Sequence, residues 1–213
     1  MKAAHPLIHI IDDDESFRIA LACQLRAAKY RVQAYSSAAE FLHSPTIHEP
    51  GCAIVDLGMP EMNGLELQEK IAAMRDPLPV VFLTARGDVP SSVRAMRAGA
   101  EDFLGKTAPG KDLLGAVARA LARDQNERSA RAAIQARRAL LATLSERERE
   151  VLALVVRGLL NKQIAAELFL HERTVKFHRS NITTKLRMPS VAELALFVQS
   201  IGGPDALLGS RSS

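Results

Sequence analysis

The sequence predicts an α/β domain on a doubly wound, five-stranded parallel sheet, followed by a helical linker and a second, all-α four-helix domain. In the first half, short runs rich in β-branched residues alternate with longer stretches of helical periodicity, which is typical of a parallel sheet with helices on both faces. In the second half the β-branched runs stop and short helical patterns follow. The composition, 47% hydrophobic and 24% charged over 213 residues, is that of a soluble globular protein and excludes disordered, fibrous and repeat classes.

The first half contains five strand–helix units. We expect the strands at Leu7–Ile11, Arg31–Tyr35, Cys52–Val55, Val80–Leu83 and Asp102–Leu104, and the helices at about 15–29, 36–43, 63–75, 89–98 and 110–123. Polar residues end three of these strands: Asp12 and Asp13 follow the first, Asp56 the third and Thr84 the fourth. Because ligands of open α/β sheets bind at the carboxyl ends of the strands, we expect these side chains to converge there.

A helical pattern then continues to Leu144 without proline, and without glycine beyond residue 115, although residues 124–131 show no apolar stripe. We predict a helical linker at 124–142, which a frayed connector, a continuous rod and a dimeric coil would all explain. The linker separates a first domain at 1–123 from a second at 143–203, whose helices we expect at about 146–157, 162–168, 172–187 and 190–200. The tail at 204–213 is rich in glycine, serine and proline and is expected to be flexible.

Charge is distributed unevenly along the chain. The net charge is +4, but the first 124 residues carry 14 basic and 16 acidic residues, whereas the rest carry 14 and 8. With no tryptophan and 4% aromatic residues, stacking on single-stranded nucleic acid is disfavoured, so duplex DNA is the favoured partner of the basic half. No apolar run is long enough to span a membrane and no signal-peptide core is visible, so we expect a cytoplasmic protein without a membrane partner. We expect Cys23 and Cys52 to be core thiols.

The converging acids of the first half predict a phosphoryl-acceptor site. Placing Asp12, Asp13 and Asp56 together costs repulsion, which a divalent cation or a lysine such as Lys106, just past the fifth strand, would compensate. Carboxylate oxygens with few other ligands suit Mg²⁺. An aspartate beside Mg²⁺, a lysine and the Thr84 hydroxyl can accept a phosphoryl group.

Five motifs at the right intervals resemble the receiver domain of two-component response regulators over about residues 5–123, which implies a flavodoxin-like fold. They are Ile10-Ile11-Asp12-Asp13-Asp14-Glu15, Val55-Asp56-Leu57-Gly58-Met59-Pro60-Glu61-Met62-Asn63-Gly64, Leu83-Thr84-Ala85, Ala95-Met96-Arg97-Ala98-Gly99-Ala100 and Phe103-Leu104-Gly105-Lys106. Gly87-Asp88-Val89-Pro90 further resembles the FixJ-like branch of the NarL/LuxR class.

The resemblance implies a role for each matching residue. It implies that Asp56 accepts the phosphoryl group, that Lys106 pairs with it, and that Thr84 and Phe103 move in response and alter a dimerisation face on the fourth helix and fifth strand. The implied metal site comprises Asp13, Asp56 and the Gly58 carbonyl, with Asp12 as an acid beside them.

One departure from the family concerns the peptide bond after Lys106. The family has Lys-Pro with an often cis bond, whereas this chain has Thr107, and a cis bond without proline costs roughly 3–4 kcal/mol. We therefore expect a trans bond and a displaced Lys106. Phosphorylation with an altered lifetime and a weakly phosphorylated receiver are both compatible with this departure.

In the second half, one helix presents two different faces. Val175, His178, Ile182 and Leu186 form a stripe that we expect to be buried. The opposite face carries two cations, two hydroxyls and one ring: Arg173, Lys176, Phe177, Ser180 and Thr184. Such a face suits the major groove, and a preceding helix and short turn predict a helix-turn-helix.

The second half also resembles a LuxR-type helix-turn-helix over about residues 143–201, through 144–152, 158–165, 173–178 and Lys185-Leu186. The resemblance implies that Lys176, Phe177 and Ser180 read bases, whereas the phosphate contacts would be Asn161, Lys162, Arg173, Thr174, Arg179 and Lys185. Phe169 and His171 replace the usual glycine and serine of the turn, so we expect a re-formed turn and a weaker helix cap. In the last helix Val191, Leu194, Ala195 and Val198 would complete the core, with a dimer contact as the alternative.

Together these features predict a two-component response regulator and not an enzyme. A histidine kinase would phosphorylate Asp56, the receiver would form a homodimer, and the basic domain would bind double-stranded promoter DNA, with RNA polymerase as a further candidate partner. One alternative is a Mg²⁺-dependent phosphoaspartyl enzyme, although Gly58 stands where such an enzyme has a second acid. The other is a DNA-binding protein whose receiver dimerises without phosphorylation.

Overall fold

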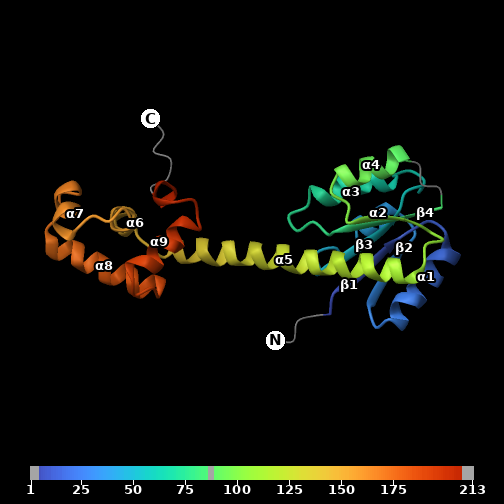
Figure 1. Cartoon of the computed structure of the whole chain (residues 1–213), viewed down its shortest axis with the longest axis horizontal. Coiled ribbons are helices and arrows are strands. Elements are labelled where there is room, and N and C mark those ends of the chain that lie inside the picture. Colours follow the sequence, from blue (N-terminus) through green and yellow to red (C-terminus); the bar gives the residue numbers. More distant parts are fainter. Residues whose placement is uncertain (1–4, 86–88, 208–213) are drawn as a thin grey trace. The chain divides into compact units, whose positions relative to one another are not determined.

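The computed structural model describes residues 5–85 and 89–207, so Gly87 and Asp88 of the predicted FixJ-like motif lie outside the described residues. The chain divides into two compact units, Met1–Ser129 and Ala130–Ser213, which are described one at a time (Figure 1). Within the described ranges, no helix is long and apolar enough to cross a membrane.

The first unit contains the predicted five-stranded parallel sheet. Its strands are β1 (Leu7–Ile11), β2 (Arg31–Tyr35), β3 (Gly51–Asp56), β4 (Val80–Thr84) and β5 (Asp102–Gly105), in the order β2-β1-β3-β4-β5. The predicted strands are confirmed, and β3 is longer than expected by one residue at each end. Asp56 and Thr84 are therefore the last residues of their strands, and Asp12 directly follows β1.

Helices cover both faces of the sheet. The helices of this unit are α1 (Glu15–Ala27), α2 (Ala38–Leu42), α3 (Gly64–Ala72), α4 (Val89–Arg97) and the first part of α5 (Gly110–Ala142). Phe41, Leu67 and Ala95 bring α2, α3 and α4 into one core, whereas Leu25 and Val117 bring α1 and α5 into the other. This two-sided arrangement confirms the doubly wound fold (Figure 1).

Helix α5 includes both the predicted fifth helix and the predicted linker. It is one helix from Gly110 to Ala142, as the rod interpretation expects, and the division between the units falls inside it after Ser129. Near its end, Leu140 and Leu141 pack partly against the core of the second unit.

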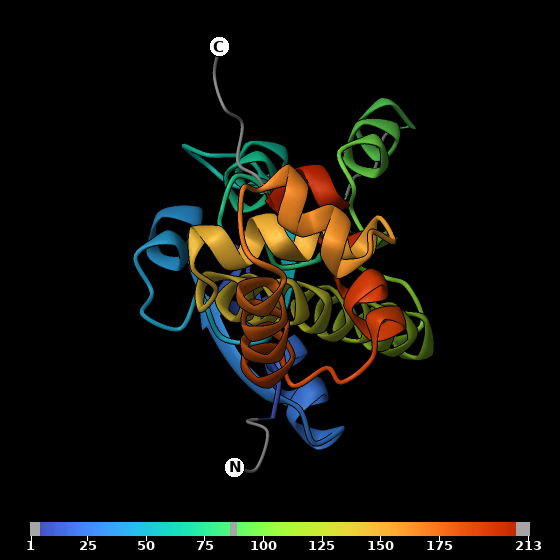
Figure 2. The ribbon, with the colours of Figure 1, turned by 90° about the vertical axis from the view of Figure 1, so that its left-hand side faces the viewer.

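The second unit is the predicted all-α domain, and in Figure 2 its helices, in orange to red, face the viewer. It contains α6 (Glu146–Val156), α7 (Asn161–Glu167), α8 (Glu172–Leu186) and α9 (Val191–Gln199), followed by a 3₁₀ turn, η1 (Pro204–Leu207). Val151, Ile164, Val175, Ile182 and Phe197 lie in its aliphatic core. Ser145 and Glu148 form the capping box that begins α6.

Three expectations about burial and order are wrong. The tail is ordered over 204–207, because Leu207 is buried in the core and Asp205 pairs with Arg157 at 2.8 Å; residues 208–213 lie outside the described residues. Val191 is 43% exposed, and Phe197 is buried from α9. Cys23 is exposed, because it lies on the face of α1 turned away from the sheet, whereas Cys52 is buried as expected.

Candidate functional site

The acidic pocket lies at the carboxyl ends of β1 and β3. Ile11 pairs with Val55 in the register of these strands, which places Asp12 beside Asp56. One carboxylate oxygen from each of Asp12, Asp13 and Asp56 lies within 4.8 Å of the others. Asp12 and Asp56 are buried, whereas Asp13 is exposed. The sheet therefore gathers the three acids as the strand-end rule predicts.

Lys106 contacts two of these acids. Its Nζ lies 2.7 Å from Asp12 Oδ2 and 3.2 Å from Asp56 Oδ2. The peptide bonds of the described residues are trans, as expected at Thr107. The expected displacement of Lys106 is wrong, because its backbone N–H donates to the Thr84 carbonyl at 2.8 Å and so extends the pairing of β5 with β4.

The shared lysine changes the pKa values in the pocket. Burial raises the pKa of Asp12 above its ordinary value, although the hydrogen bond from Lys106 opposes this. Burial would lower the pKa of Lys106, but its bonds to Asp12 and Asp56 outweigh burial and raise it. Asp56 Oδ1 is buried and has no hydrogen-bond partner among the described residues. The pocket thus contains one buried carboxylate oxygen without a hydrogen-bond partner in the described structure, next to Lys106.

Thr84 and Phe103 lie on the strands beside this pocket. Thr84 is buried at the end of β4 and pairs with Gly105 in the register, next to Lys106. Phe103 is half-buried in β5, and its ring centroid lies 5.9 Å from that of Phe82. Phe103 therefore lies three residues before the site residue Lys106, on the strand that pairs with the strand of Thr84.

The two faces predicted for α8 are present in the second unit. Val175, Ile182 and Leu186 are buried and His178 is half-buried. The opposite face exposes all five predicted side chains: Arg173, Lys176, Phe177, Ser180 and Thr184. Helix α8 therefore exposes cations, hydroxyls and an apolar ring on one face.

The predicted phosphate-contacting residues fall into two groups. Lys162 and Arg173 are exposed and Thr174 is half-buried. Arg179, in contrast, donates to Asn161 Oδ1 at 2.8 Å, and Lys185 Nζ lies 2.7 Å from the buried carboxylate of Glu148. The second group is thus already engaged inside the unit.

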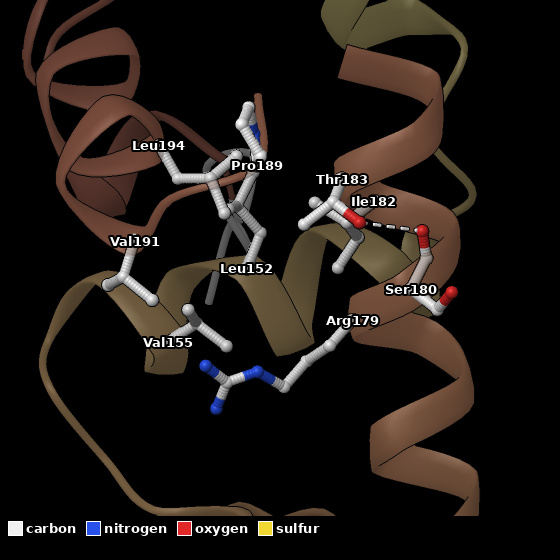
Figure 3. Close-up of a pocket in the computed structure, with 9 residues that line it drawn as sticks. All are labelled: Leu152, Val155, Arg179, Ser180, Ile182, Thr183, Pro189, Val191 and Leu194. Carbon is white, nitrogen blue, oxygen red and sulfur yellow. Dashed lines mark hydrogen bonds between the residues drawn. The ribbon is translucent and has the colours of Figure 1, made fainter. Parts of the chain in front are cut away.

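A hollow of about 230 Å³ lies behind this face, between α6, α8 and α9 (Figure 3). Figure 3 shows the Arg179 side chain extending from α8 towards α6, and the Thr183 hydroxyl donating to the Ser180 carbonyl at 2.8 Å. The hollow is lined by Leu152, Val155, Arg179, Ser180, Ile182, Thr183, Pro189, Val191 and Leu194. The Arg179 side chain therefore lies on the side of α8 that faces α6, and Asn161 of α7 holds it there.

The turn between α7 and α8 keeps the conformation that a glycine usually provides. Phe169 has φ of 54° and its side chain is 95% exposed, so the expected re-formed turn is wrong. The reason is that the helices on both sides are fixed by the core, and the turn residue accepts the strain. His171 begins α8 without a side-chain capping bond, which agrees with the predicted weak cap.

Comparison with known proteins covers both units. The family described as response regulator receiver domain matches residues 8–118, and the family described as bacterial regulatory proteins, luxR family, matches residues 142–198. This chain belongs to the response regulators of the LuxR class. Its relatives include the response regulator protein TmoT of Ectopseudomonas mendocina, 40% identical over 91% of this chain and 88% of TmoT. Nodulation protein W of Bradyrhizobium diazoefficiens is 38% identical over 92% of this chain and 86% of the length of Nodulation protein W.

Solved structures agree with this membership. The low-resolution structure of the response regulator StyR matches with a TM-score of 0.86 and 43% identity, over 92% of this chain and 99% of StyR. Full-length FixJ from B. japonicum matches with a TM-score of 0.56 and 34% identity, over 92% and 97%. A receiver joined to a LuxR-type DNA-binding domain implies that this response regulator regulates transcription.

The acidic pocket of this response regulator fits Mg²⁺, which receiver domains typically bind. Both Asp12 oxygens are engaged, by the Asp14 N–H at 2.9 Å and by Lys106. Asp13 is exposed and Asp56 Oδ1 has no hydrogen-bond partner in the described structure, so these two acids offer oxygens that a cation would satisfy. Gly58 lies two residues beyond the end of β3.

Sequence reasoning missed two residues that shape the sites. Lys106 Nζ lies 4.6 Å from the ring centroid of Phe17, a cation–π contact that helps to aim the lysine. Phe17 lies four residues after Asp13, a spacing that could have indicated a side chain over the pocket. Glu148 contacts Lys185 across 37 residues of sequence, and no local pattern indicates such a contact.

Proposed function

We propose that a partner histidine kinase phosphorylates Asp56, and that phosphorylation promotes receiver dimerisation and sequence-specific DNA binding. The observation that carries this proposal is the buried Asp56 Oδ1, unpartnered among the described residues while Lys106 neutralises the other oxygen. A buried carboxylate oxygen that accepts no hydrogen bond in the described structure, next to a lysine, keeps a lone pair available for attack.

Phosphoryl transfer needs little further chemistry from the protein. A carboxylate oxygen of Asp56 attacks the phosphorus of the kinase phosphohistidine, the P–N bond breaks, and the imidazole leaves. Lys106 and the Thr84 hydroxyl would stabilise charge on the phosphoryl oxygens. Asp13, Asp56 and the Gly58 carbonyl would hold Mg²⁺, which when bound supplies further neutralisation, and Asp12 keeps Lys106 in place.

The phosphoryl group would act on the face formed by α4 and β5. As Thr84 moves towards the new oxygens, Phe103 would turn into the space behind it. The neighbouring face of α4 already exposes Val89, Val93 and Met96, at 75%, 42% and 48%. Covering these side chains in a homodimer would stabilise the phosphorylated form.

The second unit would bind an inverted-repeat promoter site as a dimer, through α8. Lys176, Phe177 and Ser180 would contact base edges in the major groove, whereas the phosphates would be contacted by Asn161, Lys162, Arg173, Thr174, Arg179 and Lys185. Arg179 would exchange its bond to Asn161 for a phosphate, and Lys185 would share its charge between Glu148 and DNA. RNA polymerase would be a further partner at the promoter.

The phosphorylation step is tested with acetyl phosphate and Mg²⁺ on the wild type, Asp56→Asn and the exposed control Asp112→Asn. Intact mass, oligomeric state and affinity for a duplex enriched from a random library by the wild type are measured. We expect one phosphoryl group, a dimer and tighter DNA binding in the wild type and the control alone. DNA affinity that the phosphodonor leaves unchanged would overturn the switch in favour of a phosphorylation-independent regulator, and steady consumption of acetyl phosphate without phosphoprotein would favour an enzyme.

The DNA contacts are tested by comparing Lys176→Ala with Lys162→Ala. The first should lower affinity for the selected site by roughly tenfold and relax its sequence preference, since a good base contact contributes about 1–3 kcal/mol. The second should weaken binding to all sequences alike and reduce the salt dependence. Unchanged sequence preference in Lys176→Ala contradicts the assignment.

A further inference from the structure

A buried acid ties helix α5 to the sheet. Asp124 is 2% exposed, and its Oδ2 accepts a hydrogen bond from the backbone N–H of Gly51 at 2.9 Å. Gly51 begins β3, the strand that ends at Asp56. A Cβ at Gly51 would lie 1.8 Å from the Leu7 carbonyl oxygen, so the close approach of β3 to β1 at this position requires glycine. Asp124 thus holds α5 at the end of β3 that lies opposite the acidic pocket.

Arg128, one turn further along α5, completes this contact. Its Nε donates to both Asp124 oxygens, at 2.8 and 3.0 Å, and its Nη1 and Nη2 donate to the carbonyls of His48 and Glu49, each at 3.2 Å. We call Gly51, Asp124 and Arg128 the α5 anchor. Enclosed charge pairs are costly to desolvate but directional, so they fix one geometry more strictly than apolar contacts do.

Two arginines of α5, Arg119 and Arg123, also make polar contacts near β5, but at the surface. Arg119 pairs with Asp102 and Arg123 donates to the Gly99 carbonyl, but their side chains are 57% and 43% exposed. Exposed pairs hold a helix weakly. Beyond the anchor, residues 132–136 are all exposed, and a helix without a buried face frays unless its neighbouring turns are held. The anchor is therefore a buried attachment of α5 to the first unit that lies shortly before this exposed stretch.

We propose that Asp124 and Arg128 are positioning residues for signal transfer: the α5 anchor joins β3, which carries Asp56, to the linker and keeps the linker helical. This inference rests on the proposed phosphorylation switch. It assigns to the anchor neither the chemistry at Asp56 nor the contact with DNA. Cutting the anchor should therefore leave both activities in place and remove their coupling.

The test compares the full chain with Arg128→Gln and with Arg138→Gln, which removes the same charge from an exposed position further along α5. Phosphorylation by acetyl phosphate with Mg²⁺ is followed by intact mass, DNA affinity is measured with and without the phosphodonor on the enriched duplex, and amide exchange is followed over 121–135. In Arg128→Gln we expect normal phosphorylation and normal unphosphorylated affinity. We expect the gain in affinity on phosphorylation to fall at least about threefold, and exchange over 124–131 to quicken about tenfold.

Asp124→Asn is the second variant, because its amide oxygen can keep the bond from Gly51 while the charge is lost, and we expect an intermediate effect. It decides the question if Arg128→Gln does not fold. An undiminished gain in the folded variants overturns the proposal even if exchange quickens, since the anchor would then only order the helix. Loss of phosphorylation or of unphosphorylated affinity overturns it as a general folding defect. If the proposed function fails instead, the wild type and Arg138→Gln show no gain either.

Discussion

Each unit of this response regulator holds a lysine against buried carboxylate oxygens, and the two arrangements differ in what is left unsatisfied. Lys185 contacts one acid, Glu148. Glu148 also accepts a hydrogen bond from the Ser145 N–H at 2.8 Å, as part of the capping box of α6. Lys106 meets two acids, and one oxygen of Asp56 is left without a partner among the described residues.

The pKa values of Glu148 and Asp12 also differ, although both oxygens of Asp12 have partners. Burial alone would raise the pKa of Glu148, but Lys185 and Ser145 lower it, whereas burial prevails at Asp12 and raises the pKa there. The comparison teaches that a lysine–carboxylate contact is structural where the acid also helps to cap a helix, as Glu148 does. It can become a reactive site where two acids share the lysine and one buried carboxylate oxygen has no hydrogen-bond partner in the described structure, as at Asp56.

Glu148→Ala should have the largest effect on stability. It removes the Glu148 half of the capping box of α6, whereas the Ser145 half remains, and it leaves Lys185 without its acid. We therefore expect the second unit to lose about 3 kcal/mol, at the lower end for buried pairs because Lys185 is half-exposed. Unfolding by urea, followed by amide exchange in each unit, measures this. The control Glu146→Ala removes an exposed acid from the same turn and should cost under about 0.5 kcal/mol. An equal loss in both variants, or a loss in the first unit, contradicts the interpretation.

Lys106→Met should instead change chemistry. Methionine matches the stem of the lysine but leaves developing phosphoryl charge unneutralised, so we expect phosphorylation by acetyl phosphate to slow by about 10²-fold. Lys185→Met should destabilise the second unit and leave that rate unchanged. Lys111→Met, at an exposed position in the first turn of α5, should leave the rate and the stability of both units unchanged. If Lys106→Met and Lys185→Met slow phosphorylation equally, the distinction between a reactive and a structural lysine is wrong.

The stabilities of the two units should also respond differently to acid, because the first unit contains the fully buried histidine His9. This ring is fully buried, its Nδ1 lies 2.9 Å from Tyr35 Oη, and burial lowers its pKa to about 4. The unfolded value is 6.5, so the stability that neutral His9 contributes is present above pH 6.5 and is lost as the pH falls towards 4. The pKa of Glu148 is lowered in the folded protein, so the stability that ionised Glu148 contributes is present above its unfolded value of 4.5 and is lost only as the pH falls below that value.

Between pH 7 and pH 5 we therefore expect the first unit to lose about 2 kcal/mol and the second to change little. His9→Gln keeps a polar side chain but does not titrate, so comparison with it removes the contributions of all other groups. Unfolding of both proteins at the two pH values measures the difference. If His9→Gln loses as much as the wild type, the loss has another source.

The parts of this protein that sequence predicted well depend on short-range patterns and on one topological rule. Strands β1, β3 and β4 follow from apolar runs rich in β-branched residues, and the meeting of Asp12 and Asp56 follows from the common direction of β1 and β3. The buried stripe of α8 follows from helical spacing and holds at Val175, Ile182 and Leu186. These patterns are repeated along the chain, so they can be read without knowing distant contacts.

The errors arise where distant contacts decide. Lys106 was expected to be displaced because reasoning was confined to the next peptide bond, whereas its own N–H is fixed by Thr84 on another strand. Asp124 stands in a stretch without an apolar stripe and reads as solvated, yet it is buried because Gly51, 73 residues away, offers it a hydrogen bond. The period of a sequence cannot show that an acid will meet a backbone amide so far away.

The smallest expected effect concerns Phe169, where the cost of a strained backbone can be separated from the packing of the side chain. Its backbone has a positive φ and its ring is almost fully exposed. A non-glycine residue at φ of 54° costs about 1 kcal/mol, and a side chain that is 95% exposed gives no packing in return. Phe169→Gly should therefore stabilise the second unit by about 0.5–1 kcal/mol, the relief of strain being reduced by the greater freedom of glycine in the unfolded chain. Phe169→Ala keeps the strain, removes the ring and should leave stability unchanged. Thermal unfolding of the three proteins separates the two contributions: destabilisation by both substitutions would show that the ring makes a stabilising contact, and the turn would then be held by packing and not in spite of it.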